Sequence, residues 1–245
     1  NQYHQYYCVD DSLGLPDNNI TDIYRDSHNR LWVATVNGVC LYQANGNFKR
    51  VSINSANKNI EKILEDKEGR IFFFTITDLY QYDEKNNKAI TRLSKMVEKN
   101  CYNFSCHIDR KDVLWIVTSY SVKGYRTRDL KLIAPNPVQS YPIASFLLDG
   151  HQLYISGYNG MQLFDTDTRK WQQLPAALQG LQIPNDMVSG IHPYGEKGNL
   201  LLSTTKHGLL YFNAQEGTIL PQSDKNFPFE VPDMQVNKML TDSKG

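Results

Sequence analysis

Short runs of apolar residues separated by polar turns follow one another along this chain, and no stretch repeats apolar positions at helical spacing. In the N-terminal part these runs cover residues 20–24, 30–35, 39–42 and 48–52. They are rich in valine, isoleucine, tyrosine and phenylalanine and are bounded by asparagine, aspartate and glycine. This pattern is typical of β-strands joined by tight turns. It predicts a four-stranded antiparallel sheet with the first strand innermost, in a chain that is nearly all β.

The same group of strands recurs along the sequence. A segment with an aspartate, then a bulky residue, then a turn and a second apolar run is found at residues 26–42, 66–82, 109–125, 149–164 and, more loosely, 198–212. Aligned on Trp32, Phe72, Trp115, Tyr154 and Leu201, the copies are 40, 43, 39 and 47 residues apart. A period of about 40 to 50 residues built from short strands predicts the blades of a β-propeller. We expect the aromatic members of the series to fill the seams between neighbouring blades.

The repeats predict one propeller domain over residues 1–245. Its blades would cover residues 15–53, 54–94, 96–134, 137–175 and 182–222, with part of a sixth at 233–245. Residues 1–10 would form an outer strand that closes the ring on a blade from the C-terminal end. Because five repeats and part of a sixth make no obvious ring, we expect a fragment of a longer, seven-bladed propeller.

The amino-acid sequence of the repeats resembles the two-component regulator propeller repeat, whose pattern is roughly D-x-x-G-x-L-W-I-G-T-x-x-G-L-x-x-Y-D. Residues 14–20 resemble the recurrent lead-in of that family, and residues 181–187 are a looser copy. Phe74, Val117 and Ser156 depart from the pattern near its small glycine position. Such repeats form the periplasmic sensor region of Bacteroides-type hybrid two-component regulators.

The resemblance implies a function for the chain. It would be the extracytoplasmic part of an inner-membrane receptor that binds an oligosaccharide non-covalently and controls a histidine kinase, and through it transcription, outside this chain. Its partners would be the oligosaccharide and adjacent blades or domains of the same receptor, with homodimerisation left open. A fold alone does not establish a function, so two alternatives stay open. One is a structural or dimerisation scaffold, and the other is a propeller polysaccharide lyase or glycosidase.

Composition narrows the classes of partner. The 26 acidic and 26 basic residues balance, and no basic run offers a footprint for nucleic acid. No window of 18 apolar residues predicts a membrane span, and we expect no direct membrane contact. The four cysteines, Cys8, Cys40, Cys101 and Cys106, form no metal or redox pattern. Cys101 and Cys106 would face opposite sides of one strand, so we expect free, mostly buried thiols.

Propellers bind ligands on the face formed by two sets of loops, those that lead into each inner strand and those between the second and third strands. In this chain the loops are rich in tyrosine, asparagine, serine and lysine, which can stack on sugar rings and hydrogen-bond to hydroxyls. The candidate ligand-binding residues are Tyr120, Tyr158, Lys123, Lys206, His207, Asn37 and Asn159. The lysines and the histidine could also bind a carboxylate or sulfate. Asn37 and Asn159 have a competing explanation, because each precedes a glycine in a turn that requires a positive φ.

No catalytic, metal or cofactor site is predicted, and we expect this chain not to be an enzyme. The repeated aspartates, such as Asp26, Asp66 and Asp109, precede turns and are expected to accept hydrogen bonds from backbone amides. The six histidines are scattered, although His107 and His192 lie on predicted inner strands and could line the central channel. An enzyme would need a carboxylate pair or a tyrosine–histidine pair at the axis of the ligand face.

Overall fold

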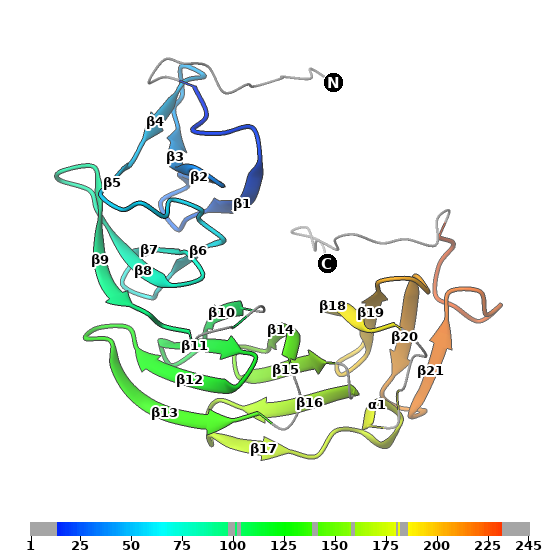
Figure 1. The fold of residues 1–245 in the computed structure, drawn as a ribbon. Helices are drawn as coiled ribbons and strands as arrows, with labels where there is room; N and C mark the ends of the chain where they lie inside the picture. Colours follow the sequence, from blue (N-terminus) through cyan, green and yellow to red (C-terminus); the bar gives the residue numbers. More distant parts are fainter. Residues whose placement is uncertain are drawn as a thin grey trace. The chain divides into compact units, whose positions relative to one another are not determined.

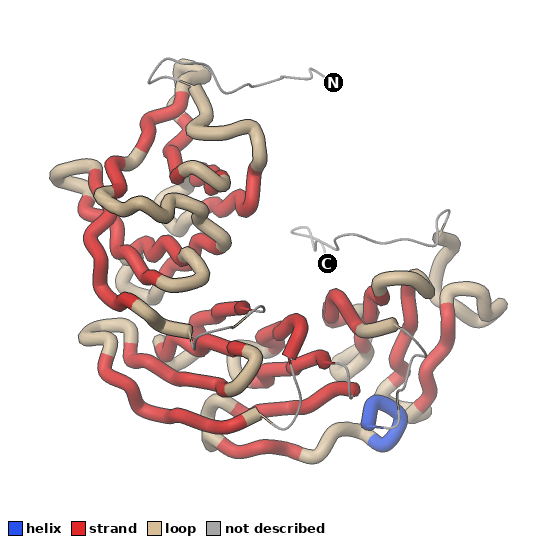
Figure 2. The backbone as a smooth tube through the Cα atoms, in the orientation of Figure 1, coloured by secondary structure: helices blue, strands red, loops and turns tan. Residues whose placement is uncertain are grey.

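The computed structural model describes residues 14–97, 101, 104–138, 142–157, 160–179, 181 and 186–231. The chain divides into two compact units, the first holding strands β1–β9 and the second most of strands β10–β21, with residues 126–131 grouped with the first. Figure 2 shows that the described residues are almost entirely strand and loop, with the four-residue helix α1 (Ala176–Gln179) as the exception. The prediction of a nearly all-β chain is confirmed.

The first unit contains two sheets (Figure 1). One has the order β1-β2-β3-β4 and the other the order β5-β9-β8-β7-β6, with all pairs antiparallel except β5 and β9. The strands are β1 (Ile20–Arg25), β2 (Leu31–Thr35), β3 (Gly38–Tyr42), β4 (Phe48–Arg50), β5 (Ser52–Ile53), β6 (Lys62–Glu65), β7 (Ile71–Phe74), β8 (Asp78–Asp83) and β9 (Lys88–Ser94).

The second unit contains three four-stranded sheets, each in sequential strand order. The strands are β10 (Phe104–Ile108), β11 (Val113–Thr118), β12 (Ser121–Arg126), β13 (Lys131–Pro137), β14 (Pro142–Leu148), β15 (Gln152–Gly157), β16 (Gly160–Asp165), β17 (Lys170–Gln172), β18 (Val188–Pro193), β19 (Leu200–Thr204), β20 (Leu209–Asn213) and β21 (Thr218–Pro221). First strands of successive sheets are neighbours, with β10 beside β14 and β14 beside β18. These are propeller blades, with the first strand innermost as predicted. The expected closing strand at residues 1–10 and the sixth blade at 233–245 lie outside the described residues.

Large side chains fill the seams between blades inside each unit. Trp32, which is fully buried, packs its ring 5.5 Å from that of Phe73 on the next blade and 4.9 Å from that of Tyr82. Trp115 occupies the same position in the third repeat, with its ring 5.2 Å from that of Phe164. Tyr154 packs in a buried cluster with leucines of the following blade. The predicted seam role is therefore confirmed for Trp32, Trp115 and Tyr154.

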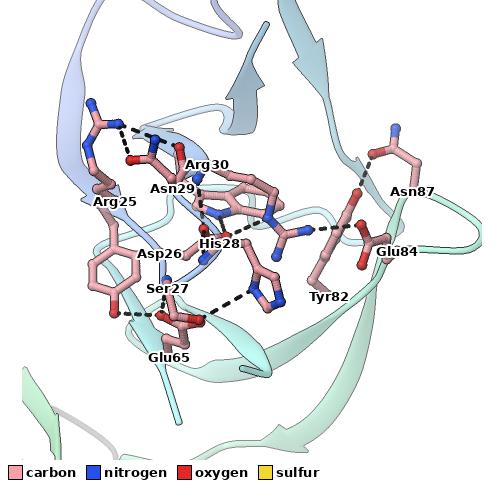
Figure 3. Close-up of polar contacts among 12 residues, drawn as sticks. Arg25, Asp26, Ser27, His28, Asn29, Arg30, Glu65, Tyr82, Glu84 and Asn87 are labelled. Atoms are coloured by element: carbon pink, nitrogen blue, oxygen red, sulfur yellow. Dashed lines mark hydrogen bonds and ion pairs between the residues drawn. The ribbon is translucent and has the colours of Figure 1, made fainter. Parts of the chain in front are cut away.

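The repeated aspartate holds the turn between the first and second strands (Figure 3). In the first blade, Asp26 Oδ1 accepts hydrogen bonds from the amides of His28 and Arg30 at 3.0 and 2.8 Å. Its Oδ2 accepts from Arg30 Nε at 2.6 Å and from the indole Nε1 of Trp32 at 2.8 Å. The expected bonds to backbone amides are thus present, and the bond to the tryptophan ties the turn to the seam. Asp109 binds Trp115 Nε1 in the same way, at 2.7 Å.

Three local predictions were wrong. The expected strand at 48–52 is interrupted at Val51, after which β5 leaves the first sheet and pairs parallel with β9 of the second. Ser52 N–H donates to Asn87 O at 3.1 Å, and the side-chain Nδ2 of Asn87 donates to Arg50 O at 2.9 Å, so pairing with the next blade replaces the continuation of β4. Cys101 lies outside β10 and is only partly buried, whereas Cys40 and Cys106 are buried free thiols. Lys123 lies within β12 rather than in the preceding loop.

Candidate functional site

The two predicted sets of loops meet at the same end of their sheets, which we call the loop face. In several blades, a backbone hydrogen bond joins the turn between the second and third strands to a residue just before the inner strand or just after the outer strand. The bonds run from Val36 N–H to Asn19 O, from Met96 N–H to Thr77 O, from Val138 N–H to Tyr120 O and from Thr205 N–H to Met187 O. Side chains from both sets of loops can therefore reach a molecule bound there.

A threonine at the end of the second strand shapes most of these turns. Thr35 Oγ1 donates to Gly38 O at 3.0 Å, and Thr204 Oγ1 donates to Gly208 O at 3.1 Å. Both hydroxyls also accept an amide from within the turn. The positive φ of the first of these turns falls on Gly38, at 133°, and not on Asn37. The side chain of Asn37 is therefore not selected by that backbone requirement.

The turn of residues 205–208, between β19 and β20, is held by a carboxylate from the other set of loops. Asp186 Oδ1 accepts from the amide of Met187 at 2.7 Å, and from the amide of Thr205 at 2.9 Å and its hydroxyl. Asp186 Oδ2 accepts from the amides of Lys206 and His207, both at 3.0 Å, and lies 2.6 Å from His207 Nδ1. The structure thus brings together two predicted ligand residues, Lys206 and His207, around an aspartate.

The electrostatics of this turn favour a permanently charged aspartate. Burial of Asp186 would raise its pKa, but the hydrogen bonds from Thr205, His207 and the backbone amides outweigh burial and hold that pKa well below its usual range. The Asp186 side chain has no solvent exposure, while that of His207 is 53% exposed. Lys206 is also exposed and forms no ion pair within the described part of the chain. The turn therefore presents nitrogen-bearing side chains to solvent over a buried negative charge.

The other predicted ligand residues are more scattered. Tyr120 lies at the tip of the β11–β12 turn and is 42% exposed, as expected for a loop-face aromatic. Lys123 is half-buried within β12. Asn37 is exposed and belongs to the first unit, whereas the other described candidates belong to the second. Tyr158 and Asn159 lie outside the described residues.

A small cavity of about 240 Å³ opens beside Asn37 at the loop face of the first unit. Arg50 lies at its wall and donates to the carbonyls of Gly14 and Leu15 at 3.0 and 2.7 Å, which docks the lead-in segment on its own blade. The described residues of the cavity wall include two cationic side chains and no carboxylate. It is lined by Pro16, Asn37, Gly38, Val39, Arg50, Val51, Ser52, Ile53 and Lys58.

The inner strands of the second unit carry a separate polar cluster. His107 Nε2 on β10 lies 2.9 Å from Ser145 Oγ and 3.0 Å from Ser145 O on β14, and Ser105 Oγ hydrogen-bonds to Ser145 Oγ. His192 on β18 is half-buried, and burial lowers its pKa. In the first unit, Asp22 on β1 similarly accepts from Ile63 N–H on β6 at 2.9 Å. These contacts join neighbouring inner strands, which is a structural role.

Neither a metal site nor a membrane span is found in the described residues. No group of three or more histidine, cysteine, aspartate or glutamate side chains is placed to hold a metal ion there. Within the same residues, no helix has the length and apolar character needed to cross a bilayer.

Sequence reasoning missed Asp186 as a functional residue. Its partners lie 19 to 21 residues further along the chain, so no local pattern marks this carboxylate. The available signal was an acidic residue at the entrance to an inner strand, followed by the unusually polar turn Thr205-Lys206-His207-Gly208. That signal does not by itself reveal which groups the carboxylate would bind.

Comparison with protein families identifies the start of the first repeat. Residues 14–37 match the sequence model described as two component regulator propeller, which covers the lead-in segment, β1 and β2. The resemblance inferred from the repeats is confirmed over these residues. No curated protein sequence matches the chain.

Solved structures share the propeller fold. The extracellular domain of a predicted one-component system from B. thetaiotaomicron has a TM-score of 0.69 and 16% identity, over 89% of this chain and 32% of that one. The extracellular domain of a predicted hybrid two-component system from the same organism has a TM-score of 0.54 and 13% identity, over 92% of this chain and 38% of that one. Virginiamycin B lyase from Staphylococcus aureus has a TM-score of 0.61 and 13% identity, over 86% of this chain and 72% of that one. At these identities the likeness shows the fold alone, and the chain spans only about a third of the first relative.

Proposed function

We propose that this propeller is the ligand-sensing, extracytoplasmic part of a hybrid two-component receptor in the periplasm, and that it binds an oligosaccharide without covalent chemistry. A kinase elsewhere in the receptor would respond to the bound ligand, and neighbouring blades or domains of the same receptor would transmit the signal. The family match at residues 14–37 and the fold shared with two extracellular receptor domains support this assignment.

The observation that carries the proposal is the turn 205–208, whose exposed polar side chains are fixed by buried Asp186. A pre-arranged polar turn loses little conformational entropy on binding, which favours recognition of a polar ligand. Tyr120, exposed on another turn of the same unit, provides an aromatic ring of the kind that stacks on sugars. Aromatic and hydrogen-bonding groups on one loop face suit a carbohydrate better than an apolar ligand.

Calorimetric titration of this chain, and of the receptor that contains it, against a panel of oligosaccharides tests the proposal. Tyr120→Ala should weaken binding about tenfold, because a well-placed aromatic contact is worth about 1 to 1.5 kcal/mol. Leu132→Ala is the matched control, since Leu132 is similarly exposed, at 44%, but lies on outer strand β13. Binding by the receptor but not by this chain would favour the scaffold alternative.

A propeller lyase or glycosidase is the second candidate to test. Among the described residues, His107 on an inner strand lies beside a hydroxyl, with both Ser145 Oγ and Ser145 O within hydrogen-bonding distance of its imidazole. Incubation of the chain with the glycan panel should yield no shortened or unsaturated products. Product formation that His107→Gln abolishes would replace the sensing proposal with an enzymatic one.

A further inference from the structure

The turn 205–208 differs from the equivalent turns of the other described blades. Four residues separate β19 from β20, whereas two separate β2 from β3 and β11 from β12, and three separate β7 from β8. A longer turn has more conformations available, and it needs additional bonds if it is to hold one of them. The Asp186 carboxylate supplies these bonds, because it accepts from three backbone amides of the turn, from the Thr205 hydroxyl and from the His207 imidazole. The longest of these turns is therefore also the one held by a buried carboxylate.

The bonding leaves particular atoms available for a ligand. Asp186 Oδ2 accepts hydrogen bonds from the backbone amides of Lys206 and His207 and from His207 Nδ1. The Lys206 ammonium and the second ring nitrogen of His207, Nε2, have no hydrogen-bond partner within the described part of the chain. A protonated imidazole donates from both ring nitrogens, so Nδ1 can bind Asp186 while Nε2 donates outward. With both side chains charged, two cations oppose one aspartate and the turn carries net positive charge.

We infer that Lys206 and His207 form an anion-binding subsite, so that the sensed oligosaccharide carries a carboxylate or sulfate group. This inference rests on the proposed function and names the class of its ligand. Lys206 provides a mobile ammonium, and His207 provides an N–H whose position is fixed through Nδ1. Asp186 acts as a positioning residue, because it orients the imidazole and the turn without reaching the ligand. Charge-assisted hydrogen bonds of this kind are stronger than those between neutral groups.

Nuclear magnetic resonance of the whole chain with small probes tests the subsite. Methyl glucuronide and inorganic sulfate should shift the ring signals of His207, while methyl glucoside, which lacks the charge, should not. The double variant Lys206→Ala, His207→Gln should weaken glucuronide binding about tenfold.

Matched controls lie at the opposite end of the same unit. Lys197→Ala removes an exposed lysine near the β18–β19 turn, and His151→Gln removes a histidine from the β14–β15 turn. Neither should change glucuronide binding. Asp186→Asn should shift the signals of the His207 ring nitrogens and weaken glucuronide binding, while far-ultraviolet circular dichroism stays that of the parent protein.

The outcomes separate this inference from the proposed function. Equal affinity for glucuronide and glucoside, or undiminished glucuronide binding by the double variant, would overturn the anion subsite. Binding of neutral oligosaccharides in that case would still support sugar sensing. Shifts of His207 by anions, with no oligosaccharide bound by the chain or its receptor, would instead support the subsite and overturn the proposed function.

Discussion

Replacement of Asp26 by asparagine tests whether the repeated aspartate holds the first blade together. The substitution keeps the shape of the side chain but places an NH₂ group at one of the two carboxylate oxygens. At Oδ2, that group would face Arg30 Nε and Trp32 Nε1, which now lie 2.6 and 2.8 Å away. Rotation of the amide would only move the conflict to the backbone amides of His28 and Arg30. Either orientation leaves two donors without an acceptor.

The expected cost follows from where those donors lie. Trp32 is fully buried, and leaving its indole N–H without an acceptor costs about 1 to 3 kcal/mol. The Arg30 side chain is 21% exposed and can turn toward water or Glu84, so loss of its pairing adds about 1 kcal/mol or less. Asp26→Asn should therefore lower the free energy of unfolding by about 1 to 4 kcal/mol.

Urea denaturation followed by far-ultraviolet circular dichroism measures this change, also in the variants that lack Trp32. Asp129→Asn, at an exposed aspartate paired with Arg126, is the control and should leave the midpoint unchanged. Combining Asp26→Asn with Trp32→Phe, which removes the indole donor, should cost less than the sum of the two single changes. A coupling energy within about 0.5 kcal/mol of zero would refute the idea that the aspartate acts through the tryptophan.

Three further predictions follow from other contacts. Burial raises the pKa of Asp26, but the hydrogen bonds that its carboxylate accepts from Trp32 and Arg30 outweigh burial and lower this pKa overall. The ionised carboxylate therefore stabilises the fold above the unfolded-state pKa, and this stabilisation is lost as the pH falls through the folded-state pKa. The stability difference between the parent protein and Asp26→Asn should accordingly be constant near neutral pH and shrink below about pH 4 in acid denaturation experiments. Gly124→Ala should cost about 1 to 3 kcal/mol in the free energy of unfolding, because the added Cβ would lie 2.9 Å from Trp115 Cζ3, and the added change Trp115→Phe should recover part of that loss. Burial raises the pKa of the Cys40 thiol to about 12, so iodoacetamide at about pH 8 should label partly exposed Cys101 before Cys40. Mass spectrometry maps the labelled residues, and early labelling of Cys40 would contradict its burial in the native state.

The strands and seams could be predicted from the sequence because their signals are local. Alternating apolar runs fix which residues face the core, and the repeated bulky residue marks the seam at Trp32, Trp115 and Tyr154. The bond from Asp26 to Trp32 was missed because the turn alone accounts for an aspartate at that position. Its second oxygen could be assigned only once the indole six residues later was seen to point back toward it.

The interactions that could not be predicted join residues far apart in the chain. Whether 48–52 continues as one strand depends on Asn87, which offers Ser52 a carbonyl partner on another blade. The arrangement of Lys206 and His207 depends on Asp186, which is not on their hairpin. Sequence reasoning could list these side chains as candidates, but their geometry follows from how the blades and loops pack.

The parallel pairing of β5 with β9 affects where the chain can be divided. Ser52 and Ile53 follow the first repeat in sequence, yet their backbone extends the sheet of the second. A cut after Ile53, at the boundary that the repeats suggest, would strip the second sheet of that strand and leave the backbone groups of β9 uncovered. Exposed strand edges of this kind invite pairing between molecules. Shortened or circularly permuted forms should therefore keep residues 52–53 with the blade that follows them. The boundary between repeats in the sequence and the boundary between sheets in the structure differ by one short strand.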